Sequence, residues 1–271
     1  MARAALRAAC RPLLCLTALL GVSQSNSAHA GPWPQPEGHG LLISSFGFTQ
    51  AQNHAGVSNP AYGNGVYQRF GLGLYGEYGV TDRITVLGAG GPQLRSLDTA
   101  GSTAGMGDVD LAIRGTFWQE EYWAGAVEGI VKVPTSYDAY VNPALGNGQV
   151  DLEPRLLIGR GLQLGSLPAF AILEAGYRFR TGGPSDQLRL DATFGVHVAP
   201  AWMILVQSFN IIGMQNQDTP GCTDFSLSTL FVSMVYEFSP RWAVQVGGTG
   251  DIATRNYNGG YGAFAAIWWR F

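Results

Sequence analysis

The chain has 271 residues, of which 46% are hydrophobic and only 13% are charged, and its formal net charge at pH 7 is −3. This mildly acidic balance provides no basic stripe for binding nucleic acid. None of the apolar stretches approaches the roughly 18 residues that a transmembrane helix needs. A membrane protein of this composition has to cross the bilayer with strands, because every backbone polar group must be hydrogen-bonded there.

The first thirty residues have the three parts of a secretory signal peptide. Three arginines precede an apolar run, and the small residues Ala-His-Ala follow at positions 28–30. We expect cleavage after Ala30, so that residues 1–30 are the signal peptide and residues 31–271 form one mature domain. Two of the three cysteines lie in the signal. Cys222 alone can form neither a disulfide within the chain nor a cysteine-based metal cluster.

Residues 31–36 contain three prolines and are expected to form a short extended segment before the first strand. Beyond them, the alternation of apolar with polar or small side chains predicts twelve strands. These are residues 40–50, 69–78, 83–90, 108–118, 123–133, 150–158, 169–180, 188–198, 202–211, 230–238, 242–251 and 261–271. The first, third and ninth alternate less cleanly than the others. Twelve is an even number, as a single-chain bacterial barrel requires.

One face of each clean strand is apolar, and the other carries the ionisable residues. Within residues 108–118, for example, Leu111 and Ile113 oppose Asp110 and Arg114. An arginine or lysine that faces lipid near the midplane costs roughly 2–4 kcal/mol, so the ionisable face is expected to line the lumen. The predicted lumen-facing residues are Arg69, Glu77, Asp108, Asp110, Arg114, Glu128, Lys132, Asp151, Glu153, Arg155, Glu174, Arg178, Arg180, Arg189, Asp191 and Glu237.

The links between the strands mostly alternate in length. Residues 79–82, 119–122, 199–201 and 239–241 are predicted to be periplasmic turns. Residues 51–65, 91–107, 134–149, 181–185, 213–223 and 254–260 are predicted to be extracellular loops. The link over residues 159–168 falls on the periplasmic side and is longer than such turns usually are, which counts against this scheme. Pro154 cannot donate a backbone hydrogen bond, so it predicts a bulge or a strand end.

The last strand resembles the C-terminal signal by which bacterial outer-membrane proteins are recognised for insertion. Every second residue from Tyr261 to Phe271 is apolar, and the chain ends in that phenylalanine. The sequence therefore predicts an all-β fold, a transmembrane antiparallel up-and-down barrel of the bacterial cell outer membrane that is a monomer. Its expected partners are outer-membrane lipid and lipopolysaccharide, the barrel-assembly machinery during insertion, and a small organic solute.

The motifs that could carry chemistry have simpler structural interpretations. Residues 71–76 have the glycine spacing of a dinucleotide loop, but they lie in a predicted strand with no helix after it. The carboxylates of Asp108 and Asp110 share a strand face with Arg114, so we interpret them as charge-compensated wall groups and not as an acid–base pair. We therefore expect no catalytic residue, no cofactor and no metal site, and we expect that the protein is not an enzyme.

Three segments together resemble one family of outer-membrane proteins. Residues 105–114 are similar to its Gly-x-Gly-Asp strand, and residues 146–154 to its Gly-x-Gly-x-x-Asp strand start. Residues 131–136 are similar to its Lys-x-Pro-Thr-Gly sequence, with Ser136 in place of the usual glycine. The family is named "MetA-pathway of phenol degradation" and is regarded as a family of transporters. The resemblance implies a barrel channel associated with small aromatic or hydrophobic compounds.

The predicted function is an outer-membrane channel or transporter for the passive passage of small hydrophobic or aromatic molecules. Barrels of about eight strands are filled by side chains and those of about sixteen hold open channels, so twelve strands predict a narrow pore. Two alternatives stay open. One is a plugged structural or adhesive barrel without transport. The other is an outer-membrane lipid hydrolase, because His54, Ser58 and Asn59 faintly resemble the catalytic His, Ser and Asn of outer-membrane phospholipases, although their spacing differs.

Overall fold

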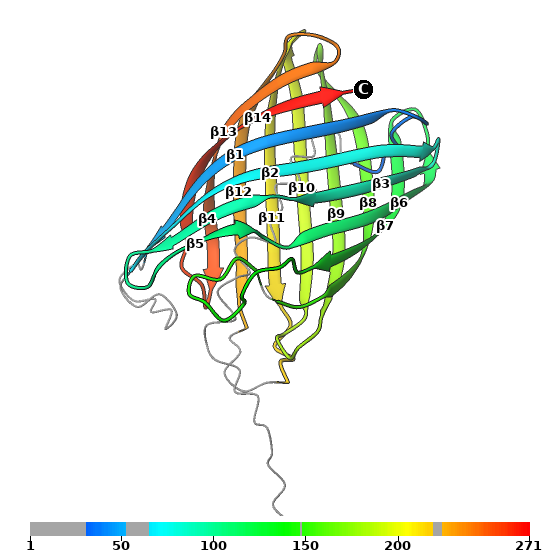
Figure 1. The fold of residues 1–271 in the computed structure, drawn as a ribbon. Coiled ribbons are helices and arrows are strands. Elements are labelled where there is room, and N and C mark those ends of the chain that lie inside the picture. Colours follow the sequence, from blue (N-terminus) through cyan, green and yellow to red (C-terminus); the bar gives the residue numbers. More distant parts are fainter. Residues whose placement is uncertain (1–30, 53–64, 147, 219–223) are drawn as a thin grey trace, which may run out of the picture.

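The structure is a computed structural model that describes residues 31–52, 65–146, 148–218 and 224–271. Its strands are β1 (Gly40–Gln52), β2 (Val66–Thr81), β3 (Ile84–Gly90), β4 (Pro92–Leu97), β5 (Gly101–Met106), β6 (Val109–Gln119), β7 (Trp123–Val133), β8 (Asp151–Leu164), β9 (Leu167–Arg180), β10 (Gln187–Ala199), β11 (Trp202–Gly213), β12 (Ser226–Glu237), β13 (Trp242–Arg255) and β14 (Gly260–Arg270). They form one antiparallel sheet that curls into a closed barrel of tilted strands (Figure 1).

The fourteen strand segments make up twelve long strands of the barrel wall. Two long strands are interrupted near the middle, so that β3 and β4 form one of them and β5 and β6 form the other. Both β3 and β4 pair with β2 in one continuous register, in which Leu74 lies opposite Gly90 and Gly71 lies opposite Gln93. In the same way β5 pairs with β4, and β6 pairs with β3. β1 pairs with β14 on one side and with β2 on the other, which closes the ring. The predicted twelve-stranded antiparallel barrel is confirmed.

Residues 91–107, predicted to be an extracellular loop, form the β4–β5 hairpin instead. Their glycine, serine and threonine content indicated a loop, but in the barrel both halves continue the strands below them. Glycine is needed at the interruption, since a Cβ on Gly91 would lie 1.9 Å from the carbonyl oxygen of Leu72. The backbone N–H of Gly107 donates to the carbonyl oxygen of Gly91 at an N···O distance of 3.2 Å. The strand pairing is therefore interrupted at Gly91, but the barrel wall continues beyond it.

The connection between β8 and β9 is shorter than the sequence indicated. β8 extends to Leu164, and only Gly165 and Ser166 separate it from β9. Gly165 has a φ of +63°, a conformation that glycine adopts without steric cost. This periplasmic turn is therefore short, as the alternation of short and long links requires.

Pro154 lies within β8 and makes neither the bulge nor the strand end that it predicted. The β8–β9 pairing passes from Leu152 opposite Phe179 to Arg155 opposite Gly176, with the two positions between them unpaired. The register is the same on both sides of this gap. The missing N–H of the proline thus interrupts the ladder locally, and the neighbouring pairs hold the strand in place.

Two hydrogen bonds join the first residue of β1 to the C-terminal residue on the side of the short turns. The N–H of Gly40 donates to the carbonyl oxygen of Phe271 at 2.9 Å, and the N–H of Phe271 donates to that of Gly40 at 3.0 Å. These bonds extend the β1–β14 seam by one further pair. The C-terminal residue is therefore part of the barrel wall.

The outer face of the barrel is apolar. Leu111 and Ile113 on β6 are 53% and 62% exposed, while Arg114, the next residue along the same strand, is 3% exposed. Aromatic rings gather near the short turns, where Trp242 stacks on Trp269 with ring centroids 5.9 Å apart. Such aromatic girdles mark the boundary between lipid and water in outer-membrane barrels.

One cation lies on the outer face within the periplasmic half of the barrel. Arg160 falls beyond the segment that was predicted as a strand, and its guanidinium carbon lies 4.8 Å from the centroid of the Trp123 ring. An arginine can reach the interface while its stem covers apolar surface. Arg160 is therefore an interfacial residue.

A closed barrel with an apolar exterior satisfies all its backbone groups in lipid. This fold assigns the protein to the bacterial outer membrane. Among the described residues, no helix is long and apolar enough to cross a membrane.

We predict that a charge placed on the outer face destabilises the barrel. Val246 is 60% exposed and lies opposite Ala265 in the middle of β14. Val246→Arg should lower the free energy of unfolding in lipid vesicles by roughly 2–4 kcal/mol. Tyr140→Arg, in the loop after β7, is the control and should change it little. Equal stability of the two variants would contradict the placement of Val246 in lipid.

Candidate functional site

The interior of the barrel has a charged wall and an apolar wall, which face the same lumen. The charged wall consists of the inward-facing ionisable residues of β6 to β10, namely Asp110, Arg114, Glu128, Lys132, Asp151, Glu153, Arg155, Glu174, Arg178, Arg180, Arg189 and Asp191. The apolar wall consists of inward-facing residues of β11 to β14 and β1, namely Met203, Leu205, Phe231, Val235, Ala243, Phe264, Ala266, Trp268, Leu41 and Ile43. The lumen is therefore amphipathic in cross-section.

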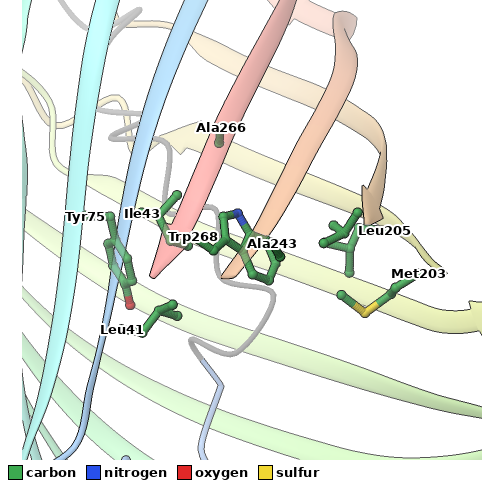
Figure 2. Close-up of a cluster of buried hydrophobic side chains, with 9 residues drawn as sticks. Leu41, Ile43, Tyr75, Met203, Leu205, Ala243, Ala266 and Trp268 are labelled. Carbon is green, nitrogen blue, oxygen red and sulfur yellow. The ribbon is translucent and has the colours of Figure 1, made fainter. Parts of the chain in front are cut away.

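The apolar wall is centred on Trp268 of β14. Figure 2 shows this indole between Ile43 of β1 on one side and Ala243 of β13 on the other, with Tyr75 of β2 beyond Ile43. The indole N–H of Trp268 donates to Oε1 of Gln245 at 3.1 Å. The N–H of this inward-facing indole is thus bonded, and the ring, at 0% exposure, packs its large apolar surface against its neighbours.

Arg155 of β8 lies at the centre of the charged wall. Its Nη1 lies 2.8 Å from Oε2 of Glu174 and 3.1 Å from Oδ2 of Asp191, and its Nε also pairs with Glu153. The second oxygen of Glu153 lies 2.5 Å from Nε of Arg178. Three adjacent strands thus contribute to one network, because neighbouring strands lie only about 4.8 Å apart.

Arg114 of β6 forms a second centre nearer the periplasmic turns. Its Nε lies 2.8 Å from Oε2 of Glu128, and its Nη1 lies 3.4 Å from Oε1 of Glu77. The hydroxyl of Tyr75 also donates to Oε1 of Glu77. A buried carboxylate is costly unless a cation and hydrogen bonds compensate it, and Glu77 has both kinds of partner.

Lys132 of β7 forms a third centre toward the extracellular side. Its Nζ lies 2.9 Å from Oδ2 of Asp151 and 3.1 Å from Oδ2 of Asp108, which stands just before β6. Nε of Arg180 lies 3.9 Å from the same oxygen of Asp151. Lys132 therefore holds the edge of β6 against β8 through two carboxylates.

Three further residues of the predicted lumen-facing set, Arg69, Glu237 and Arg189, are not members of these ion pairs. Nε of Arg69 donates to Oε1 of Gln93 at 3.0 Å. Glu237 pairs with Arg270 at 2.6 Å at the periplasmic rim, where both side chains are about one-quarter exposed, at 24% and 25%. Arg189 is 3% exposed and forms no ion pair with any described carboxylate. The role of the whole set in selectivity stays a prediction.

Sequence reasoning missed Arg95 and Gln93 on β4. Arg95 is 2% exposed and donates from Nη2 to the carbonyl oxygen of Leu145 at 2.6 Å and from Nη1 to that of Ala144. Both residues fell in the segment interpreted as a loop. The alternation of Gln93, Arg95 and Leu97 with Leu94 was the signal that could have revealed a strand here.

Part of the loop between β7 and β8 folds into the extracellular half of the barrel. Residues 143–146 are buried, and Arg95 and Gln93 hold their carbonyl groups. The hydroxyl of Tyr137 donates to Asp108 and accepts the N–H of Gly148. Burial, reinforced by the bond to Asp108, raises the pKa of the Tyr137 phenol above its ordinary value. The phenol therefore stays a neutral donor that fixes the loop.

The N-terminal strap, defined as residues 31–39, lies inside the periplasmic half of the barrel. Nη1 of Arg114 donates to the carbonyl oxygen of Gly31 at 2.9 Å, and Oγ1 of Thr116 donates to that of Pro32 at 2.7 Å. The side chain of Gln35 donates to Oε2 of Glu77 at 2.9 Å. The predicted extended segment is thus a strap that β2 and β6 of the wall hold in place.

Two glycines of the wall make room for the N-terminal strap. A Cβ on Gly159 would lie 2.5 Å from the ring of Trp33, and a Cβ on Gly79 would lie 2.2 Å from the carbonyl oxygen of Pro36. Contacts this short do not occur between non-bonded atoms. The wall is therefore matched to the strap at Trp33 and at Pro36.

The expectation of no metal site and the hydrolase alternative concern different parts of the chain. No group of three or more histidine, cysteine or acidic side chains that could hold a metal ion occurs among the described residues. His54, Ser58, Asn59 and Cys222 lie outside the residues that the structure describes. The hydrolase alternative therefore stays a prediction.

The architecture is that of outer-membrane β-barrels. An outer-membrane channel from Pseudomonas putida F1 has a TM-score of 0.68 at 16% identity, covering 90% of this chain and 98% of that one. The NanC porin gives 0.53 at 8% identity, covering 84% of this chain and 98% of that one. The KdgM porin in complex with disordered oligogalacturonate gives 0.51 at 8% identity, covering 85% and 99%.

At these identities the likeness shows a shared fold. No protein-family model matches the chain, and no curated protein matches its sequence. The class of protein defined by the fold is therefore an outer-membrane barrel. The function has to be argued from the lumen.

We predict that Arg155→Ala lowers the free energy of unfolding by about 3 kcal/mol, because it leaves three carboxylates without their shared cation where little water reaches them. The control is Arg270→Ala, whose pair with Glu237 is partly exposed and should contribute no more than about 1 kcal/mol. Denaturant unfolding in detergent measures both. Equal, small losses would show that water hydrates the network.

Proposed function

We propose that the protein is an outer-membrane channel through which small hydrophobic or aromatic organic molecules pass passively. We further propose that it is related to the "MetA-pathway of phenol degradation" family, and that it acts as a monomer inserted by the barrel-assembly machinery after loss of its signal peptide. The amphipathic lumen is the observation that supports the channel. A solute with an apolar ring and a polar substituent could contact both walls at once.

The two walls differ in what they offer to a solute. Trp268 and Phe264 of β14 and Phe231 of β12 supply the aromatic rings of the apolar wall, with the ring centroids of Phe231 and Phe264 5.7 Å apart. Across the lumen, the ion-paired residues centred on Arg155 present oriented donors and acceptors. Ligand sites commonly combine such apolar lining with a few placed polar groups.

Two inward segments narrow the path along the lumen. The N-terminal strap occupies the periplasmic half, and residues 143–146 occupy part of the extracellular half. A solute would have to pass both segments, so the channel is expected to select by size. This supports passage of small molecules and argues against passage of polymers.

The strap also favours the second candidate, a plugged barrel without transport. Its bonds to Arg114, Thr116 and Glu77 would hold a permanent plug equally well. Liposome swelling with small aromatic solutes, compared with sugars of similar mass, separates the two functions. Faster entry of the aromatic solute supports the proposed channel, and no swelling with any solute would favour the plug.

We predict that displacing the strap widens the pore. Gly159→Ala places a methyl group against the ring of Trp33 and should push the strap from its seat, so the single-channel conductance should rise. Gly129→Ala is a matched control, since a Cβ there meets nothing within 4 Å. If the conductance of Gly159→Ala equals that of the parent and of Gly129→Ala, the strap does not limit passage.

A further inference from the structure

A small cavity of about 50 Å³ lies where β2 meets the interruption between β3 and β4. Six of its fourteen lining residues are glycines, so backbone rather than side chain forms much of its surface. Its polar side chains are those of Thr49, Arg69, Gln93, Arg95 and Asp108. One water needs about 10–15 Å³ by this measure, so the space suits the few heavy atoms of a carboxylate group.

Two arginines stand directly opposite each other at this cavity. Arg69 of β2 and Arg95 of β4 are cross-strand partners in the ladder, and both belong to the inward-facing set of their strands. Like charges directly opposite each other across two strands repel and destabilise the pair. An anion bound between the two guanidinium groups would compensate this repulsion.

The protein itself supplies no carboxylate to Arg69 among the described residues. Its hydrogen bond goes to the amide oxygen of Gln93, and the guanidinium of Arg95 bonds the carbonyl oxygens of Ala144 and Leu145. Asp108 also borders the cavity, but its carboxylate already pairs with Lys132 at 3.1 Å and accepts the hydroxyl of Tyr137. This contrasts with the charged wall, where Arg114, Arg155 and Arg178 all contact carboxylates.

We propose that the cavity binds the carboxylate group of a small organic anion, with Arg69 as the principal ligand and Arg95 as its electrostatic partner. Guanidinium groups present planar pairs of donors that match the two oxygens of a carboxylate. The glycines let that group approach the backbone closely, and the body of the anion would lie in the lumen. This site deepens the proposed channel function, since it names the solute class as aromatic or aliphatic acids.

Equilibrium dialysis of the detergent-solubilised protein, purified from outer membranes, against radiolabelled benzoate tests the site. Arg69→Gln should weaken benzoate binding at least tenfold. Arg83→Gln, an exposed arginine in the β2–β3 turn, is the matched control and should bind like the parent. Neutral benzamide should not displace benzoate. Unchanged binding in Arg69→Gln, or equal displacement by benzamide, overturns the proposal.

A second variant keeps the test decisive if Arg69→Gln does not fold. Gln93→Glu changes the side chain that already contacts Arg69 into a carboxylate, so it should fill the site from within and abolish benzoate binding. Gln119→Glu, at the exposed end of β6, is its control. Benzoate binding by Gln93→Glu at the parent level would overturn the proposal.

Competition with phosphate and chloride defines the ligand class. Displacement of benzoate only at much higher concentrations of these ions supports a carboxylate site, and displacement at equal concentrations overturns it. The assay needs no conduction. If the barrel binds benzoate but passes no solute, the carboxylate site is supported and the channel function is refuted. If the barrel passes solutes but does not bind benzoate, the channel function is supported and the carboxylate site is refuted.

Discussion

The closure of the strand ring between β1 and β14 is the constraint on which the rest of the structure depends. In lipid, an unpaired strand edge would leave a row of backbone groups without partners, at a cost of several kcal/mol for each group. The seam is paired from Leu41 opposite Arg270 to Ala51 opposite Gly260, and the bonds between Gly40 and Phe271 extend it further. Once the ring is closed, the alternation of side chains fixes every residue as inside or outside.

Closure also explains the composition of the two interior walls. The charged wall contains six carboxylates and six cations on β6 to β10, and these strands are neighbours in the ring. Because a long side chain reaches only the adjacent one or two strands, charges must be compensated locally. Arg155 does this across β9 to β10. The strands of the apolar wall carry few charges inward, so their interior is filled by rings and aliphatic groups.

The sequence alone predicted the strand number, the antiparallel order and the apolar outer face, because these follow from local alternation. It could not predict which parts of the chain enter the lumen. Nothing in the local pattern of residues 31–36 shows that Arg114 and Thr116, more than eighty residues away, bond their carbonyl groups. The β4–β5 hairpin was missed because its local composition was misleading. Its glycine-rich sequence is typical of a loop, and only the pairing of β4 with β2 shows that it continues the wall.

Glycine connects these observations, because it acts at different points of the wall for one physical reason. At Gly79 and Gly159 the missing side chain gives room to the N-terminal strap, and at Gly91 it lets the interrupted strand approach β2. Around the cavity of Arg69 it leaves space that no side chain of the wall fills. A barrel of twelve strands lies between those of about eight strands, which side chains fill, and those of about sixteen, which hold open channels. At these positions the wall makes room for a neighbouring segment by omitting a side chain. Glycine does this while its backbone N–H and C=O groups can still bond the neighbouring strands.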